Sequence, residues 1–418
     1  MRVLQAIWDG GGNTAPQLEI AAELVRRGHE VRVLGHRCQR ERVERSGATF
    51  LAYRHAPDGD ASRPETDLLR DWEARTPIGA FARVRDRLMY GPSALFARDV
   101  VEALEHQPAD VVAWDYLLLG AGMGAERAGV RSAAVIHTVY PLPAPGLPPF
   151  GQGLMPARGA AGRLRDRVLG VAFRRAFAPG LRAANDSRRG LGLGELDTPF
   201  DQLLGADALL VLTSPEPDFA GDVELPPHVR FTGPIVPDAP PGSWESPWAA
   251  DDERPLVLVS FSTTFMDQQR LAERVVEALA GLPARALLTT GPAIDGARLP
   301  SAANIEIRRV VPHAAVLPEA SLMVTHAGMG TVHAALTAGV PLVCLPDGRD
   351  QGDVAARVVQ RGAGVRARPG ASARTLRRVI AQSLGDASLR DGARRLAAAF
   401  AQERGAARAA DELEALTA

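Results

Sequence analysis

The chain contains no lysine, since all 48 of its basic residues are arginines. A Schiff base to a lysine is therefore impossible, which excludes the usual pyridoxal-phosphate chemistry. The phosphate-binding loop G-x-x-x-x-G-K-[ST] is excluded for the same reason. Any bound phosphate must be held by backbone N–H groups, by histidine, serine or threonine, or by arginine.

Cysteine, net charge and long apolar runs are also scarce. Cys38 and Cys344 are the only cysteines, too few for a zinc cluster or a disulfide framework. The net charge of −1 creates no field that would attract nucleic acid or an anionic membrane. No apolar run reaches the ~20 residues of a spanning helix, and no apolar leader precedes the first strand. We therefore expect a cytoplasmic protein without a nucleic-acid partner or stable membrane insertion.

The length of 418 residues favours two domains, because a compact domain has ~100–200 residues. The segment Val236–Trp248 contains four prolines and a glycine, which is typical of a break between periodic segments. We predict an acceptor domain at 1–236, a linker at 237–248, a donor domain at 249–395 and a helical tail at 396–418.

The first residues predict a βαβ unit. A buried strand at Arg2–Ile7 is followed by three consecutive glycines, which form a tight turn. Pro16 then suits the first turn of a helix, and Gly28 suits its C-terminal cap. Such units build parallel sheets, and the same rhythm restarts after the linker. We expect an α/β fold of two doubly wound, Rossmann-like domains, whose strand ends face each other across a cleft.

The densest chemistry follows a predicted strand at Leu322–Thr325. His326 ends that strand, and a glycine-rich segment then opens a helix at Thr331. Gly328 and Gly330 would let the backbone approach a phosphate closely, and a helix N-terminus offers free N–H groups and a positive dipole. The imidazole of His326 and the hydroxyl of Thr331 would add two further donors.

Two other segments could reach the same ligand. Ser262, Thr263 and Thr264 follow the first strand of this half, so their hydroxyls could meet the phosphates from the opposite loop. Asp350 and Gln351 follow one strand later. A carboxylate beside an amide is well suited to binding sugar hydroxyls.

Dinucleotide and metal chemistry fit the sequence poorly. A G-x-G-x-x-G motif would need glycine where His333 stands, and the looser match from Gly120 to Ala125 lacks the acidic residue expected downstream. The turn Asp58–Asp60 contains D-x-D, but it lies in a polar loop that we interpret as solvated. We predict no resident cofactor and no metal site.

Several of these segments together resemble a known family. His326–Thr331, preceded by Val311-Pro312-His313 and followed by Asp350-Gln351, resembles the inverting GT-B glycosyltransferases of family 1, and more narrowly their antibiotic-tailoring branch. The start of the chain, from Pro16 to Val31, resembles that branch too.

The resemblance implies a nucleotide-sugar co-substrate and assigns roles to several residues. The diphosphate would be held by His326, Gly328, Gly330 and Thr331, with Ser262 and Thr263 in the phosphate-contacting loop. The Val311 backbone would contact the base, and Asp350 and Gln351 the sugar hydroxyls. The tryptophan that many members stack on the base is absent, which favours dTDP over UDP.

The acceptor side departs from the family pattern. The family places its catalytic histidine three residues before the proline of the first helix, and this position is Asn13, which cannot act as a base. The family's partnering aspartate matches Asp115. Three candidates for the base stay open: Asp115 alone, His137 at the end of a strand, and Asp9 in the first glycine turn. An acidic phenol or an amine acceptor would need little help.

The sequence thus predicts an enzyme that transfers a hexose or deoxyhexose from a dTDP- or UDP-sugar to a small-molecule natural product, with inversion. Closure of the two domains would exclude water. Two alternatives stay open: a nucleotide-sugar epimerase of the same architecture, and a non-catalytic glycosyltransferase-like partner, which Asn13 keeps in play. The acceptor and a homodimeric state are also open.

Overall fold

The computed structural model describes residues 1–240 and 242–417, which form two compact units. The first unit contains residues 1–150, 156–235 and 403–418, and the second contains 151–155 and 236–402. The sequence prediction treated 396–418 as a separate tail, whereas residues from Glu403 onward pack with the first unit. Pro241, in the predicted linker, and Ala418, in the predicted tail, lie outside the described residues.

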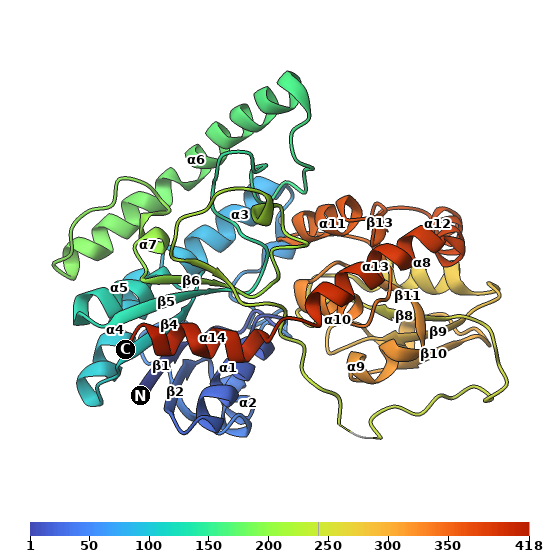
Figure 1. The fold of residues 1–418 in the computed structure, drawn as a ribbon, viewed down its shortest axis with the longest axis horizontal. Helices are drawn as coiled ribbons and strands as arrows, with labels where there is room; N and C mark the ends of the chain where they lie inside the picture. The colour runs from blue at the N-terminus through green and yellow to red at the C-terminus, as the bar shows by residue number, and fades with distance from the viewer. Residues whose placement is uncertain (241, 418) are drawn as a thin grey trace. The chain divides into compact units, whose positions relative to one another are not determined.

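The first unit is built on a seven-stranded sheet in the order β3-β2-β1-β4-β5-β6-β7 (Figure 1). All neighbouring pairs are parallel. The strands are β1 (Arg2–Ala6), β2 (Glu30–Gly35), β3 (Thr49–Ala52), β4 (Val111–Asp115), β5 (Arg131–Ile136), β6 (Ala208–Val211) and β7 (Val229–Phe231).

Both faces of this sheet are buried, because side chains along a strand alternate between two apolar cores. On β4, Val112 and Trp114 belong to one core and Val111 and Ala113 to the other. The α-helices of the unit are α1 (Thr14–Arg26), α2 (Arg40–Arg45), α3 (Pro77–Val84), α4 (Ser93–His106), α5 (Leu119–Ala128), α6 (Gly159–Gly190), α7 (Asp201–Leu204) and α14 (Gly405–Ala415). This is the doubly wound arrangement that the βαβ pattern predicts.

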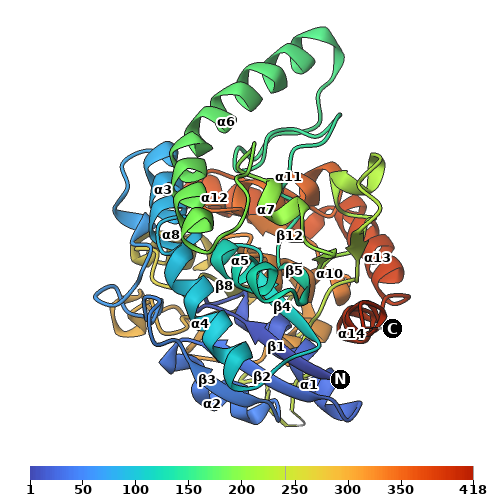
Figure 2. The ribbon, with the colours of Figure 1, turned by 90° about the vertical axis from the view of Figure 1, so that its left-hand side faces the viewer.

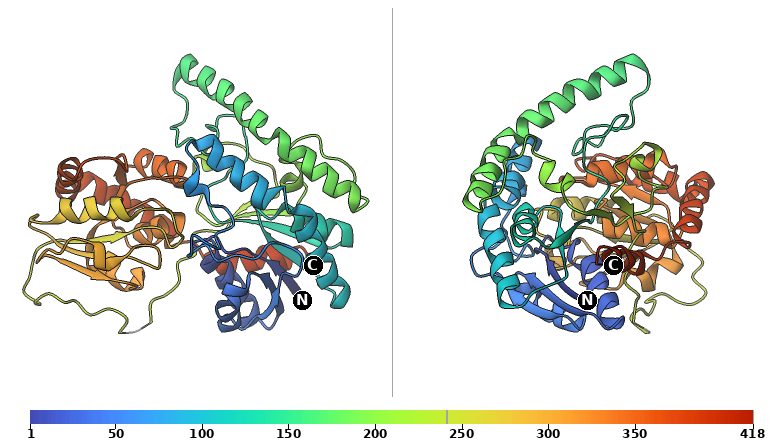
Figure 3. Two further views of the ribbon diagram at one scale, coloured as in Figure 1. Left: turned by 180° about the vertical axis from the view of Figure 1, so that it is seen from behind. Right: turned by 60° about the vertical axis from the view of Figure 1, so that its left-hand side comes forward.

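The long helix α6 is uneven in its packing. Its second half buries Phe177, Gly180, Ala184 and Arg188, whereas its first half buries no residue. Figures 2 and 3 show that first half extending past the sheet and the other helices of its unit. Within the described residues, no helix combines the length and the apolarity needed to cross a membrane.

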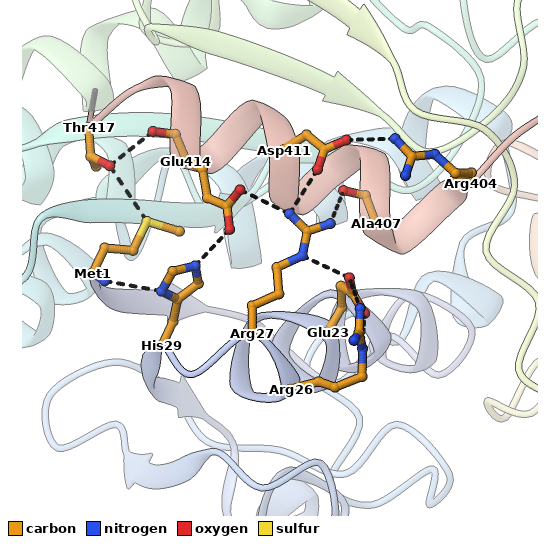
Figure 4. Close-up of polar contacts among 10 residues, drawn as sticks. All are labelled: Met1, Glu23, Arg26, Arg27, His29, Arg404, Ala407, Asp411, Glu414 and Thr417. Atoms are coloured by element: carbon orange, nitrogen blue, oxygen red, sulfur yellow. Dashed lines mark hydrogen bonds and ion pairs between the residues drawn. The ribbon is translucent and has the colours of Figure 1, made fainter.

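The C-terminal helix α14 returns to the first unit and packs beside α1 (Figure 4). Its residues Ala409, Ala410 and Leu413 are buried in the same core as Leu24 of α1. Arg27, directly after α1, donates to Asp411, Glu414 and the carbonyl of Ala407. Apolar burial and charge pairing together explain why the predicted tail belongs to this unit.

The second unit holds a six-stranded parallel sheet in the order β10-β9-β8-β11-β12-β13. Its strands are β8 (Leu256–Ser260), β9 (Arg285–Thr289), β10 (Ile305–Arg308), β11 (Ala320–Thr325), β12 (Leu342–Cys344) and β13 (Gly364–Arg366). Its α-helices are α8 (Gln269–Leu279), α9 (His313–Val316), α10 (Met329–Thr337), α11 (Gln351–Gln360), α12 (Ala373–Gly385) and α13 (Ala387–Phe400).

Candidate active site

The acceptor-side candidates Asn13, Asp115 and His137 meet at one edge of the first sheet. Asp115 ends β4, His137 directly follows β5, and Asn13 precedes α1. Carboxyl ends of adjacent parallel strands lie at the same edge, so these distant residues converge. Asp115 Oδ2 accepts from Asn13 Nδ2 at 3.0 Å and from Gln17 Nε2 at 2.8 Å, and Oδ1 accepts the Leu117 N–H at 3.1 Å.

His137 faces the same carboxylate. Its Nδ1 lies 3.1 Å from Asp115 Oδ2, at ion-pair distance but away from the direction of a hydrogen bond. The edge of Tyr116 packs on the imidazole with ring centroids 5.1 Å apart. The His137 side chain is 15% exposed and Asp115 is fully buried, so only the histidine can reach a ligand.

The environment of Asp115 favours its charged form. Burial alone would raise the pKa of this carboxyl, but the His137 ring and the hydrogen bonds from Asn13 and Leu117 outweigh it, so the pKa is lowered. A buried carboxylate beside an imidazole stabilises the imidazolium that forms when the ring takes a proton. The pair can therefore perform general-base chemistry.

Asn13 braces this pair and is itself buried. Its Oδ1 accepts the Gly10 N–H, while its Nδ2 donates to the Trp8 carbonyl and to Asp115. The amide thus ties the glycine turn to the carboxylate, and it neither takes up nor releases a proton near neutral pH. Gln17, one helical turn later, escaped the sequence analysis, although its spacing from Asn13 could have indicated it.

Asp9 is engaged elsewhere, since its Oδ2 accepts the Ala61 N–H at 2.9 Å. Asp9 also lies near Cys38 and Asp60. These three residues form one of two clusters, among the described residues, whose side chains could ligate a metal ion. Here Asp60 binds Ser62 and Cys38 donates to the Gly59 carbonyl. In the second group, Asp99 accepts the backbone N–H groups of residues 54, 55 and 56, while His55 pairs with Glu102. Both groups therefore have structural partners.

In the second unit, β11 leads into the N-terminus of α10. Ala327 takes a left-handed conformation with φ of 70°, which turns the chain sharply between strand and helix. Gly328 is the N-cap, no side chain caps the helix, and its first turn carries no acidic residue. The first N–H groups of a helix have no partner within it, so this end offers donors and a positive dipole to an anion.

His326 lies under this helix N-terminus. A Cβ at position 328 would come within 2.5 Å of His326 Nε2, so only glycine allows the imidazole to sit there. Burial lowers the pKa of His326 to about 4, and nearby Arg349 and His313 act in the same direction, against a hydrogen bond with the Ser260 backbone. At neutral pH the ring is uncharged.

The loop after β8 brings hydroxyl groups together. Ser262 is buried, and its Oγ lies 2.8 Å from Thr264 Oγ1, while Thr263 is exposed. Thr264 also accepts from Arg349 Nη1 at 3.1 Å. Thr264 follows β8 and Arg349 follows β12, and these strands flank β11 in the sheet, so the loops after them lie at the same edge on either side of the loop after β11.

Arg349 is therefore a site residue that the sequence analysis missed, and it contacts Thr264, which the sequence analysis named. Arg349 stands directly before Asp350, at φ of 51°, and could have been noticed as the cation nearest the Asp350-Gln351 pair. Gln351 is buried, with its Oε1 accepting the Asp347 N–H at 2.8 Å. Asp350 is half-buried at the N-cap of α11.

The remaining predicted donor residues lie nearby along the chain. Gly330 is exposed and Thr331 half-buried in the first turn of α10, and Val311 is buried just before α9. His333 lies further along α10 and packs edge-on against Phe400. It is thus a core residue.

Comparisons with known proteins show which family the chain belongs to. Residues 273–416 match the model of the erythromycin biosynthesis protein CIII-like C-terminal domain. The 4'-demethylrebeccamycin synthase of Lentzea aerocolonigenes is 35% identical, over 99% of both chains. The chain belongs to the antibiotic-tailoring glycosyltransferases of family 1. The demethyllactenocin mycarosyltransferase of Streptomyces fradiae is 27% identical to this glycosyltransferase, over 98% of this chain and 85% of that one.

Solved structures confirm the predicted GT-B fold. The calicheamicin glycosyltransferase CalG4 matches with a TM-score of 0.77 at 24% identity, over 99% of this chain and 98% of that one. The glycosyltransferase VinC, in complex with dTDP, matches with a TM-score of 0.69 at 22% identity, over 100% and 99% of the two chains. Family membership makes this protein a nucleotide-sugar glycosyltransferase, not the epimerase or the non-catalytic partner that the sequence alone left open.

Proposed function

We propose that this glycosyltransferase transfers a hexose or deoxyhexose from a dTDP- or UDP-sugar to a small-molecule natural product, with inversion at the anomeric carbon. The observation that carries the proposal is the proximity of His137 to the buried Asp115, a pair that would supply a catalytic base in place of the family histidine that Asn13 replaces.

The donor diphosphate would bind at the N-terminus of α10. The dipole and unpaired N–H groups of that helix stabilise negative charge, each favourable contact contributing ~0.3–1 kcal/mol or more. Neutral His326 has one N–H, which could donate to the diphosphate in the tautomer that gives up the Ser260 backbone contact, and Arg349 would supply the positive charge beside it. This set would neutralise the leaving group without a metal ion. The absence of a stacking tryptophan before His313 favours dTDP, the ligand present in the VinC structure.

The acceptor would be activated in the first unit. With Nδ1 turned toward Asp115, His137 presents Nε2 for the acceptor proton. As that proton moves to Nε2, the acceptor forms a bond to the anomeric carbon and the bond to the diphosphate oxygen breaks. Attack from the face opposite the leaving group inverts the centre. Asp115 stabilises the imidazolium until the proton is released to water.

The acceptor class is supported by the relatives. One is named as a rebeccamycin-type synthase, one as a mycarosyltransferase and one as an oleandomycin glycosyltransferase. All three names refer to the assembly of small natural products. We therefore propose an acceptor of that class.

Calorimetry with dTDP and UDP, without added metal, tests the donor half. Wild type should bind at least one nucleotide, and His326→Ala should weaken binding at least ~tenfold, or ~1.4 kcal/mol. His106→Ala, which removes an exposed histidine from the first unit, should leave binding unchanged. A folded wild type that binds neither nucleotide would contradict the proposal.

A further inference from the structure

A short segment of the chain, which we name the strap (residues 151–155), is held by the second unit. Residues 1–150 and 156–235 on either side of it belong to the first unit. The strap is anchored on α11. Asp353 Oδ2 accepts the Gly151 N–H at 2.7 Å, and its Oδ1 accepts the Gly153 N–H at 3.2 Å.

The anchoring carboxylate is almost completely buried, with 2% exposure. Burial raises the pKa of Asp353 to about 6, against the opposing effects of Arg357 and of the two strap N–H groups. Above that pH the carboxylate is ionised, and its hydrogen bonds to the strap are charge-assisted and therefore stronger than neutral ones.

Backbone packing holds the strap equally closely. Gly153 has φ of 60°, and a Cβ there would lie 2.9 Å from the backbone C and O of Gly352. A Cβ on Gly352 would in turn lie 3.2 Å from the Gly153 Cα. Arg366, at the end of β13, donates from Nη1 to the Gly153 carbonyl at 2.9 Å. Two facing glycines thus allow the strap to touch the first turn of α11.

That turn carries the proposed donor-sugar contacts. Gly352 directly follows Gln351, and the Asp353 N–H donates to the Asp350 carbonyl at 2.9 Å. The residues that anchor the strap and the residues expected to bind sugar hydroxyls therefore share one helical turn. The backbone contacts proposed for the diphosphate lie on another helix, α10, and Arg349, which precedes the turn, has its own anchor in the hydrogen bond to Thr264.

We propose that the strap positions the sugar-binding turn of α11, and that Asp353 is the positioning residue that holds the strap in place. The proposal rests on the proposed function, in which Asp350 and Gln351 contact the donor sugar. It requires that loss of the strap weaken binding of a nucleotide sugar while leaving binding of the free nucleotide diphosphate intact. A general structural defect would weaken both.

The test compares the dissociation constants of dTDP-glucose and dTDP, measured by calorimetry without acceptor. At pH 8, where Asp353 is ionised, the proteins compared are wild type, Asp353→Asn and Gly153→Ala. The control is Gly159→Ala, which has a similar φ of 69° but open space around its Cβ. We expect each strap variant to weaken dTDP-glucose at least ~fivefold and dTDP less than ~twofold, with both constants unchanged in the control.

Two further results complete the test. The double variant should bind dTDP-glucose no more weakly than whichever single variant has the lower affinity, because the two substitutions disrupt the same contact. Two outcomes would overturn the inference in strap variants whose circular dichroism matches wild type: equal weakening of dTDP-glucose and dTDP, or no change in the affinity of either. In both cases, binding of dTDP by wild type would still support the proposed donor site. If wild type binds neither ligand, the proposed function fails and the inference falls with it.

Discussion

Asn13 changes the role of its position from chemistry to support. An imidazole at this point could take a proton, whereas the amide of Asn13 holds the Asp115 carboxylate, the Trp8 carbonyl and the Gly10 N–H in one fixed arrangement. Fixed hydrogen bonds to a buried carboxylate lower the cost of keeping it charged. In the mechanism that we propose, the base is His137, at the end of the neighbouring strand.

Removal of this brace should destabilise the protein. Asn13→Ala removes the partner of the buried Trp8 carbonyl and of the partly buried Gly10 N–H, and leaves Asp115 Oδ2 with Gln17 as its side-chain amide donor, which costs ~3 kcal/mol in the free energy of unfolding. Urea denaturation followed by circular dichroism measures the loss. Gln360→Ala, which removes an exposed amide at the end of α11, should be neutral. An Asn13→Ala variant as stable as wild type would show that the brace contributes nothing.

Gly328 offers a second test with one added methyl group. The Cβ of Gly328→Ala would collide with His326 Nε2 and displace the imidazole from the helix N-terminus. We expect dTDP binding to weaken ~tenfold or more by calorimetry. Gly385→Ala, whose Cβ meets open space at the end of α12, serves as the control. Equal dTDP affinity in the two variants would argue against a role for His326.

At the scale of elements, the partly buried guanidinium of Arg27, at the end of α1, pairs with carboxylates of α14 (Figure 4). Arg27 has a 19% exposed side chain and pairs with Glu23, Asp411 and Glu414, whereas its neighbour Arg26 is 72% exposed and pairs with Glu23 alone. Arg27→Ala should lower the free energy of unfolding by ~2 kcal/mol, because three carboxylates lose a shared cation. Arg26→Ala should cause no measurable change in the same urea titration. Equal effects would contradict this account of the α1–α14 contact.

Local pattern was sufficient to predict most elements. The strands predicted at Arg2–Ile7 and Leu322–Thr325 are observed as Arg2–Ala6 and Ala320–Thr325, because they are apolar runs that end at breaks. The segment Arg40–Ala52, which forms α2 and β3, was missed because its helix is short and strongly charged. β13 was missed because three residues carry no periodicity.

The residues of the candidate site also differ in how far the sequence predicts them. Strand ends and glycine turns are visible in the sequence, so Asp115, His137 and His326 could be singled out in advance. Arg349 and Gln17 were missed, because each joins the site through a contact set by the order of the strands or by the turn of a helix, and only weak signals in the sequence indicate them.

At the scale of the whole molecule, the chain passes between its two units more often than one linker would require. The strap enters the second unit and residues 403–418 return to the first. Both crossings depend on contacts between residues distant in the sequence, such as those of Gly151 with Asp353 and Arg27 with Asp411. Such contacts leave no periodic signal, so the sequence predicted one linker and a separate tail.

Buried histidines should make the stability of the molecule depend on pH. Burial lowers the pKa of His333 to about 3, so its contribution to stability is complete above its ordinary pKa and is lost as the pH falls below ~6.5 toward that value. Between pH 7 and 5 wild type should lose ~2 kcal/mol through this residue alone. In urea titrations at both pH values, His333→Leu should lose ~2 kcal/mol less of its free energy of unfolding between pH 7 and 5 than wild type does. An equal loss in the two proteins would contradict the lowered pKa of His333.

The central claim is that His137, held by Asp115, is the base of a glycosyl transfer. The most direct measurement is the rate at which wild type and His137→Ala form a glycosylated product from dTDP-glucose and a panel of natural-product acceptors, followed by mass spectrometry. We predict product with wild type, and a kcat lowered ~100-fold or more in His137→Ala with dTDP affinity unchanged. A His137→Ala variant that keeps the wild-type kcat would contradict the account.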